Sequence, residues 1–415
     1  MRSMSNRPSR CTPILALAAL VVAACGGEPA TPPHPAAPTP EPGSSALLLA
    51  VAALDKNEDG SPRPLPARVG FLTRSGDTWS YRFLEDPDSN VFHKAIAYTP
   101  ASGPSGILTL GGTKAIVKLW STDGSSRTLW EADFGGRFSR MRDAEVGDLY
   151  GDGSAAIAIA THDQGVVAVL RPGAEGGFEV EELDRKENTI VHEIELGDLD
   201  GDGTLEVYAT PTAPNKVDGT PQPGEVVRYV PARGVERTVV ADLGTRHAKE
   251  ILVSDVDGDG RDELYVSVEA VSGGRVEIRR YDADTDPEQG VTVAELDDTL
   301  CRFLSVGDAD GDGRREMVAA THKKGLWLLR PAEGTWSAEL IDAESSGFEH
   351  ASILLDLDGD GRDELYVASD DQDQVRRYDL KDGSWERTVL FEHTDGLGRF
   401  TWNITAAPAG MLPAP

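Results

Sequence analysis

The chain has 415 residues, a length that allows two or three domains or one large repeat array. Its 70 Asp and Glu residues outnumber its 40 Lys and Arg residues, which gives a formal net charge of −30 at pH 7. Because a nucleic-acid backbone is bound by a basic protein surface, this balance argues against a nucleic-acid partner.

Residues 1–24 have the pattern of a bacterial lipoprotein signal peptide. Arginines precede an apolar run at 14–24, which has the length of a signal-peptide core and is too short to span a bilayer. The run ends in Val-Ala-Ala-Cys25-Gly-Gly, which resembles a lipobox, whose cysteine carries the lipid. We therefore expect lipidation at Cys25 and export to the bacterial cell envelope, on the periplasmic or outer-surface side, with the lipid as the only membrane contact. An ordinary secretory signal with an incidental cysteine is the alternative.

Residues 25–45 are predicted to form an extended tether, because a segment so rich in proline cannot build a packed core. Cys11 leaves with the signal peptide and Cys25 carries lipid, so Cys301 has no partner for an intramolecular disulfide. We expect Cys301 to be a small buried apolar side chain. At the other end, residues 407–415 are expected to be a disordered tail.

Between residues 46 and 406, a pattern of four short β-branched strands returns about every 50 residues. Four strands at this period are typical of a β-propeller blade. The third strands are the easiest to count, and they begin near Val69, Val117, Val166, Val226, Val276, Leu326 and Val375. The pattern predicts an all-β, seven-bladed β-propeller that works as a monomer, with six and eight blades as alternatives.

The first repeat lacks its first strand. Residues 47–54 have the pattern of a second strand, whereas residues 399–404 resemble the first strand of a later repeat and are followed by no acidic loop. We therefore expect the C-terminal strand to complete the first blade. This closure would leave no unpaired sheet edge at the junction of the two termini.

Four repeats carry a nine-residue acidic loop between their first and second strands. Carboxylates stand at its positions 1, 3, 5 and 9, glycines stand at 4 and 6, and position 7 can offer a backbone carbonyl. Calcium takes six to eight oxygen ligands, which such a curled loop can direct toward one point. We predict about four Ca²⁺ sites, with the ligands Asp198, Asp200, Asp202, Thr204 and Glu206; Asp255, Asp257, Asp259, Arg261 and Glu263; Asp308, Asp310, Asp312, Arg314 and Glu316; and Asp356, Asp358, Asp360, Arg362 and Glu364.

The loop spacing resembles the calcium loops of FG-GAP repeats, which occur in integrin α-subunit propellers and in bacterial VCBS-type proteins. It differs from an EF-hand, whose acidic ligand stands at position 12 between two helices. The Phe-Gly and Gly-Ala-Pro signature of the family is not visible, so the resemblance rests on the loops and the repeat period. It implies a calcium-stabilised propeller that binds ligands on the face opposite the loops.

The first three repeats depart from this pattern. In the first, the acidic segment 55–60 follows the second strand, which favours a polar turn, and the second has a Pro-rich segment at 100–106 instead of a loop. The third keeps Asp148 and Asp152 but has lost two other acidic positions. Since fewer charged ligands mean lower affinity, we predict a weak or empty site there.

A basic residue stands six positions before the first aspartate of each readable loop, and at the matching place in the closing strand. These residues are Arg142, His192, Lys249, Arg302, His350 and Arg399, and the second repeat offers His93 or Lys94. Because the first strand of a blade lies nearest the axis, the column predicts a ring of cations at one mouth of the axial channel, able to bind an anionic group. The alternative is that each cation pairs with a nearby acid.

No catalytic motif of the Gly-x-Ser-x-Gly, His-Glu-x-x-His, phosphate-loop or Cys-x-x-Cys type occurs in the sequence. We therefore interpret the protein as a non-enzymatic binding scaffold for a protein or a cell-surface polysaccharide, with an anionic ligand as one option. A lyase-like, polysaccharide-active enzyme on the same propeller is the alternative. A purely architectural envelope protein is the third hypothesis.

Overall fold

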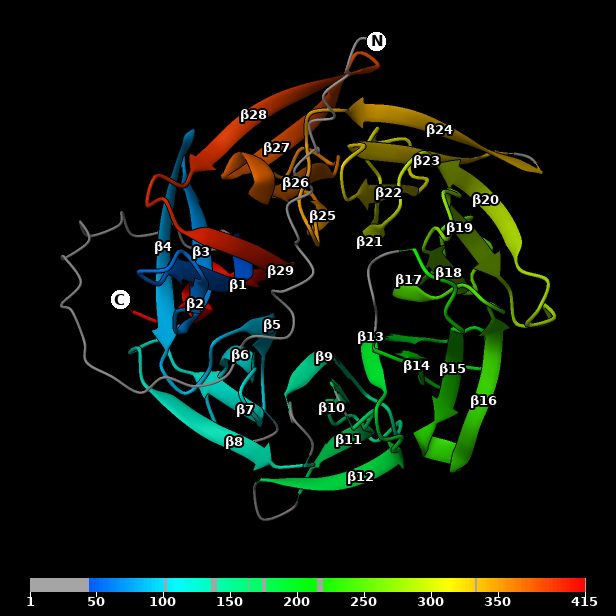
Figure 1. Ribbon diagram of the computed structural model, residues 1–415, viewed down its shortest axis with the longest axis horizontal. Helices are drawn as coiled ribbons and strands as arrows, with labels where there is room; N and C mark the ends of the chain where they lie inside the picture. The colour runs from blue at the N-terminus through cyan, green and yellow to red at the C-terminus, as the bar shows by residue number, and fades with distance from the viewer. Residues whose placement is uncertain are drawn as a thin grey trace, which may run out of the picture.

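Seven antiparallel sheets surround a central axis in the computed structural model (Figure 1). The structure describes residues 45–100, 103–135, 140–162, 164–173, 177–214, 219–332 and 334–414. Each sheet is one blade, and its first strand lies nearest the axis while its fourth forms the rim (Figure 1). The predicted seven-bladed β-propeller is therefore confirmed. The signal peptide, Cys25 and nearly all of the tether lie outside the described residues, and no described helix is long and apolar enough to cross a membrane.

Blades 2 to 7 follow one another in chain order, and each runs from the axis to the rim. Blades 2, 3 and 4 comprise β5 (Phe92–Tyr98), β6 (Gly106–Gly111), β7 (Ala115–Trp120) and β8 (Ser126–Ala132); β9 (Met141–Gly147), β10 (Ala156–Thr161), β11 (Val167–Pro172) and β12 (Phe178–Asp184); and β13 (Ile190–Gly197), β14 (Glu206–Thr212), β15 (Glu225–Val230) and β16 (Val235–Asp242). Blades 5, 6 and 7 comprise β17 (Ala248–Ser254), β18 (Glu263–Val268), β19 (Val276–Tyr281) and β20 (Val291–Leu296); β21 (Cys301–Gly307), β22 (Glu316–Thr321), β23 (Leu326–Ala332) and β24 (Thr335–Asp342); and β25 (Ser352–Leu355), β26 (Glu364–Ser369), β27 (Gln374–Lys381) and β28 (Ser384–Glu392). Two short 3₁₀ turns, η2 (Pro231–Arg233) and η3 (Asp370–Gln372), join strands in blades 4 and 7.

Blade 1 is built from both ends of the chain. β1 (Ser45–Lys56), β3 (Ala67–Ser75) and β4 (Thr78–Asp86) come from the N-terminal part, and β2 (Pro62–Pro64) pairs with the end of β1. β29 (Gly398–Pro408) lies antiparallel to β1 on the axial side, from Ser45 opposite Pro408 to Leu54 opposite Gly398. The expected closure by the C-terminal strand is therefore confirmed.

The expectation of a disordered tail at 407–415 is wrong for the described residues 407–414. β29 extends to Pro408, and η4 (Ala409–Met411) follows it. The side chain of Leu412 is buried against blade 1, and the Ala414 N–H donates to the carbonyl of Thr122 in blade 2 (2.8 Å). This segment therefore packs between two blades.

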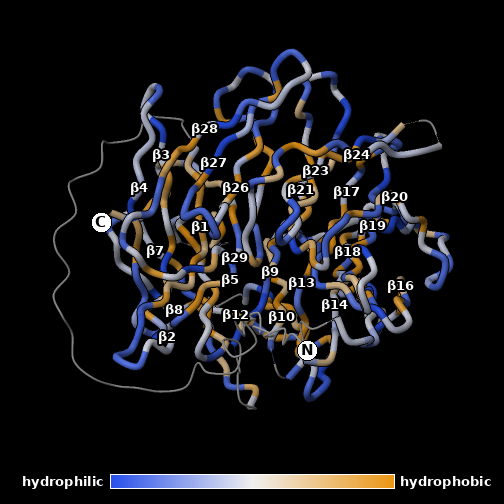
Figure 2. The backbone as a smooth tube through the Cα atoms, turned by 45° about the horizontal axis from the view of Figure 1, so that its top comes forward, coloured by the Kyte–Doolittle hydropathy of each residue, from blue (hydrophilic) through white to orange (hydrophobic). Residues whose placement is uncertain are grey.

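The core lies between neighbouring blades. Second strands are buried on both faces and are mostly apolar, as in β10, where all six residues are buried, whereas third strands such as β19 also carry charged side chains. Rim strands such as β12 face solvent and are mostly polar. Figure 2 shows the result: hydrophobic colours run along the strands, and hydrophilic colours mark the loops at both ends of the blades. Cys301 is buried in this core, as predicted.

Candidate functional site

The four acidic loops lie on one face of the propeller. Each connects an inner strand to its second strand, and all inner strands run in the same direction because every blade repeats the same antiparallel order. The first residues of the inner strands therefore lie at the opposite mouth of the channel. The fold thus separates the acidic loops from the basic column.

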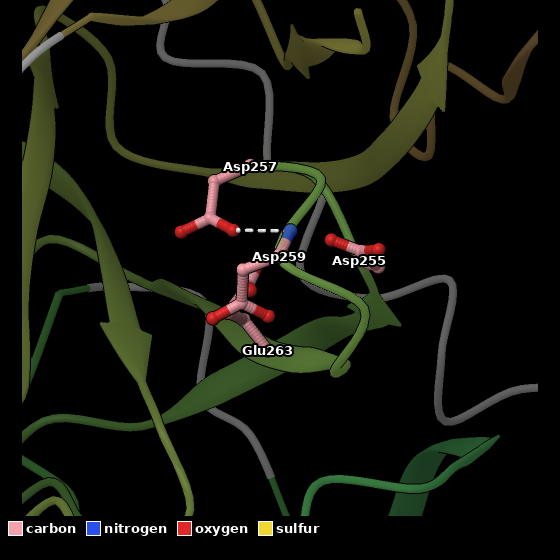
Figure 3. Close-up of side chains that lie close together, drawn as sticks. All are labelled: Asp255, Asp257, Asp259 and Glu263. Carbon is pink, nitrogen blue, oxygen red and sulfur yellow. Dashed lines mark hydrogen bonds between the residues drawn. The ribbon is translucent and has the colours of Figure 1, made fainter. Parts of the chain in front are cut away.

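In the loop of blade 5, four predicted ligands come together. Asp255, Asp257, Asp259 and Glu263 each place an oxygen within 4.8 Å of the others (Figure 3). The curl is held by backbone N–H groups that donate to the loop's own carboxylates, including Gly260 to Asp255 (3.0 Å). Gly260 has a φ of +91°, which a side chain would strain. Glycine at this position therefore allows the carboxylates to converge.

The other three loops repeat the arrangement with small differences. In blade 7, four carboxylates gather: Asp356, Asp358, Asp360 and Glu364. Three gather in blade 4 (Asp198, Asp200 and Asp202), and three gather in blade 6 (Asp308, Asp310 and Glu316). Two predicted ligands, Glu206 and Asp312, are not part of their groups. In each loop, the backbone N–H of the residue at position 7 donates to the aspartate at position 5 at 2.8–2.9 Å. The residues at position 7 are Thr204, Arg261, Arg314 and Arg362.

The glutamate at position 9 is buried and positioned by the fold. In blade 5, Glu263 accepts hydrogen bonds through Oε2 from the Val256 N–H (3.1 Å) and from the Tyr265 hydroxyl (3.0 Å). Burial raises the pKa of the Glu263 carboxyl to about 7. Tyr208 and Tyr366 contact the matching glutamates of blades 4 and 7 in the same way. The second oxygen of Glu206 contacts Arg228, and that of Glu263 lies 3.6 Å from Arg280.

Sequence reasoning missed an arginine that reaches each loop from the third strand of its own blade. The position-3 aspartates pair with Arg228, Arg280, Arg330 and Arg377 at nitrogen–oxygen distances of 2.7–3.7 Å. Arg228 also contacts Glu206, which is not part of the carboxylate group of its loop. These guanidinium groups offset part of the loop's negative charge. The signal was present in the sequence as an arginine that recurs within the third strands.

A second unpredicted feature links successive loops. Asp262 accepts the N–H of Asp198 in the preceding loop (2.8 Å), and Asp363 accepts the N–H of Asp308 (2.7 Å). Arg315 reaches back to Ser254, next to the first ligand of blade 5 (3.0 Å). Position 8 of one loop therefore orients position 1 of its neighbour along blades 4 to 7.

The loops of the first and third repeats differ in the expected way. Asp55 pairs with Arg63 across the β1–β2 turn, so this acidic segment forms a polar turn. In the third repeat, Asp152 pairs with Arg171 (2.8 Å), while Asp148 caps the loop's own N–H groups. A weak site at Asp148 and Asp152 stays a prediction.

At the opposite mouth, four residues of the predicted basic column converge. Arg142, His192, Lys249 and Arg302 come from the neighbouring inner strands β9, β13, β17 and β21. An Arg142 Nη lies 3.2 Å from His192 Nδ1, and Arg302 Nη1 donates to Glu349 (3.0 Å). Burial is the main cause that lowers the pKa of Lys249 to about 7, and the positive charge of Arg302 is the second cause. The mouth thus concentrates basic groups contributed by blades 3 to 6.

The predicted ring of six is wrong at two positions. His350 is fully buried: one ring nitrogen lies 2.7 Å from the carbonyl of Thr321 and the other 2.7 Å from Ser345 Oγ. Its φ of +58° turns the chain, so that Glu349 takes the place facing Arg302. Arg399 pairs instead with Asp373 (3.2 Å) and Asp395 (2.6 Å).

The acidic residues next to the basic column link neighbouring blades. Asp143 accepts the N–H of Ile194 (3.0 Å), and Glu250 accepts the N–H of Leu304 (2.8 Å). Lys94, from blade 2, pairs with Asp143 (3.1 Å) and with Glu145. The adjacent acids thus hold inner strands together, and Arg142 and Lys249 have no ion-pair partner among the described residues.

We expect His350 to make the fold sensitive to acid. Burial lowers its pKa to about 4, so the unfolded chain takes up a proton between the ordinary pKa of about 6.5 and pH 4 that the folded protein does not. This contribution to stability is therefore present at neutral pH and lost as pH falls. Asparagine tolerates a positive φ, so His350→Asn is a suitable substitution. Between pH 7 and pH 4.5, the free energy of unfolding should fall by about 2 kcal/mol less in this variant than in the wild type. Urea titrations of both proteins at the two pH values would measure this, and an equal acid loss would show that His350 is not responsible.

No family model matches the chain, and no curated protein matches it at a significant level. Among solved structures, the Dos1 propeller matches at a TM-score of 0.53 and 10% identity over 85% of this chain and 86% of that one. The periplasmic gluconolactonase PpgL of Pseudomonas aeruginosa matches at 0.49 and 15% identity, over 86% of this chain and 99% of that one. A functionally unknown protein from Desulfotomaculum acetoxidans matches at 0.47 and 10%, covering 84% and 96%. At this level of identity, the likeness to the Dos1 propeller concerns the fold alone, which is that of a β-propeller.

Proposed function

We propose that the protein is an exported, lipid-anchored binding scaffold, stabilised by calcium and recognising its ligand at the channel mouth opposite the acidic loops. The single observation that carries this proposal is the division of the two faces. One face gathers carboxylates, and the other gathers basic groups of which Arg142 and Lys249 have no ion-pair partner among the described residues, whereas Arg302 pairs with Glu269 and Glu349. A rigid ring that presents one prepared face is suited to binding.

Calcium is supported by the donor set of the loops. Calcium prefers oxygen ligands and tolerates flexible geometry, and the four groups offer only carboxylate oxygens. Their position between the first and second strands of a blade suits a structural role, since a bound ion would hold each hairpin and neutralise its charge. The links between loops would pass this stabilisation from blade to blade.

Binding at the mouth is tested with the calcium-loaded full chain. A screen against acidic and neutral glycans and against an envelope extract, with and without chelator, should give saturable, calcium-dependent binding. The double variant Arg142→Ala and Lys249→Ala should bind at least about tenfold more weakly, because hydrogen bonds to charged groups are lost. Arg185→Gln, which removes an exposed pair with Glu182 away from the mouth, is the matched control. A confirmed ligand that binds the double variant as tightly as wild type would show that another surface is used.

A second candidate function, a lyase-like enzyme acting on polysaccharide, is favoured by Lys249. An amine without an ion-pair partner and with a pKa of about 7 can accept a proton at neutral pH. Incubation of the calcium-loaded chain with acidic polysaccharides would separate the two functions, because a scaffold leaves chain length unchanged. Cleavage that is lost in Lys249→Gln would instead support the enzyme.

A further inference from the structure

The channel mouth has a basic arc and an aromatic arc. The basic arc consists of Arg142, His192, Lys249 and Arg302 in blades 3 to 6. The aromatic arc consists of Phe348, which precedes β25, and of Phe400 and Trp402 in β29. The ring centroids of Phe348 and Phe400 lie 5.6 Å apart, and those of Phe400 and Trp402 lie 6.2 Å apart. All three aromatic side chains are partly exposed, so the arc is not closed within the core.

The two arcs meet at stacked pairs. The guanidinium carbon of Arg142 lies 5.1 Å from the ring centroid of Trp402, and that of Arg302 lies 4.2 Å from the ring centroid of Phe348. His93 also packs against this group, with its ring centroid 4.3 Å from that of Trp402. A guanidinium group fixed by stacking keeps its N–H donors in one plane and loses little side-chain entropy on binding a ligand. The arcs are therefore preorganised relative to one another.

Several polar atoms of the basic arc are unused by the fold. Arg142 Nε and His192 Nε2 are buried, and neither has a hydrogen-bond partner among the described residues. Lys249 has neither a hydrogen bond nor an ion pair within the part of the chain that the structure describes, whereas Arg302 is balanced by Glu269 and Glu349. Unpaired buried donors and neighbouring like charges cost stability. An anion bound between Arg142, His192 and Lys249 would relieve both costs.

We propose that the channel mouth binds a small organic anion, a single carboxylate or phosphate carried on a six-membered ring. The anionic group lies among Arg142, His192 and Lys249, and the ring lies against Phe400 and Trp402. This inference rests on the proposed function, in which this face binds the ligand, and it specifies the chemistry of that ligand. An acidic sugar and an aromatic acid share this chemistry, and the experiment separates them.

Protonation of Lys249 should couple this binding to pH. The charged groups around its amine are Arg142 from β9, Arg302 from β21 and the carboxylates Glu269 and Glu349, and the titratable His192 from β13 also faces it. An anion favours the ammonium form of Lys249, so binding takes up a proton when the pH exceeds the free pKa of about 7. Affinity should therefore fall about tenfold between pH 6 and pH 8. The imidazole of His192 stays neutral over this range, because burial and the nearby cations hold its pKa well below the ordinary value.

The test is calorimetric titration of the calcium-loaded full chain with glucuronate, glucose 6-phosphate, benzoate, acetate and glucose. At least one of glucuronate, glucose 6-phosphate and benzoate should bind measurably. The ligand with the highest affinity shows whether the site prefers an acidic sugar or an aromatic acid. Acetate and glucose should bind at least about tenfold more weakly, because each lacks one of the two features. Lys249→Gln should weaken the best ligand about tenfold at pH 6 and should remove the pH dependence of glucuronate or benzoate binding, since these carboxylates are ionised throughout this range. Arg399→Gln is the matched control, since this residue belongs to the same sequence column but pairs with Asp373 and Asp395.

Each of three results would overturn the inference. The first is equal binding of glucose and the acidic ligands, the second is an equal loss in Lys249→Gln and Arg399→Gln, and the third is no binding of any anion. Thermal unfolding with and without calcium is recorded on the same samples. If calcium raises the melting temperature but no anion binds, this inference alone is wrong. If calcium does not change the melting temperature, the result counts against the proposed function.

Discussion

Removing calcium is expected to lower the melting temperature of the protein by about 10 °C or more. A site occupied at a hundredfold excess over its Kd contributes about 2.7 kcal/mol to stability, and four such sites act on one ring. Without the ion, the carboxylates of each group, which lie within 4.8 Å of one another, repel. Calcium should also restore the melting temperature after chelation, which thermal unfolding in chelator followed by a calcium titration would measure.

Single variants locate this effect in the loops. Asp255→Asn removes a ligand from a group of four carboxylates and should lower the calcium-dependent gain in melting temperature, with one site fewer in calorimetric titration. Asp148→Asn is the matched control, because the same position in blade 3 lies in a loop that has Tyr150 and Ala156 at two of the other ligand positions. Equal melting temperatures with calcium and with chelator, or an equal effect of the two variants, would contradict a calcium role for these loops.

Deleting residues 398–415 is expected to abolish the folded monomer. The deletion removes β29, which pairs with β1 along almost its whole length. Buried residues on β1, such as Leu47 and Leu49, would then lie on an exposed apolar edge strand, which promotes aggregation. Asp370 would also lose the backbone and hydroxyl donors of Thr401 that tie blade 7 to blade 1. Size-exclusion chromatography should show aggregate or no soluble protein.

A shorter deletion separates closure from general loss of the C-terminus. Removing residues 409–415 leaves β29 intact and costs only the buried Leu412 and a few contacts with blades 1 and 2, so this variant should remain monomeric with a lower melting temperature. A synthetic peptide spanning residues 397–409 should rescue the longer deletion by adding the missing strand. A monomeric, stable protein without β29 would show that the ring does not depend on this closure.

Local patterns explain what could be predicted from the sequence. The acidic loops follow from residue spacing within nine positions, and the seven blades follow from the repeat of short apolar strands; both depend on contacts between residues close in the chain. The closing strand could also be recognised, because residues 399–404 repeat a pattern whose remaining strands are missing. The tail was misjudged because burial of Leu412 depends on blades 1 and 2, which lie near the other end of the chain.

Periodicity and spacing along the chain establish the repeat, the closing strand and the residues of the acidic loops, because they constrain hydrogen bonding within each blade. Which members of the basic column meet depends on how the blades are arranged around the axis. Arg142, His192, Lys249 and Arg302 converge because the ring brings their strands together, whereas the positive φ of His350 and the acids around Arg399 direct those two side chains elsewhere. The links from Asp262 and Asp363 to the preceding loops likewise arise from contacts between blades, which no period within a blade encodes.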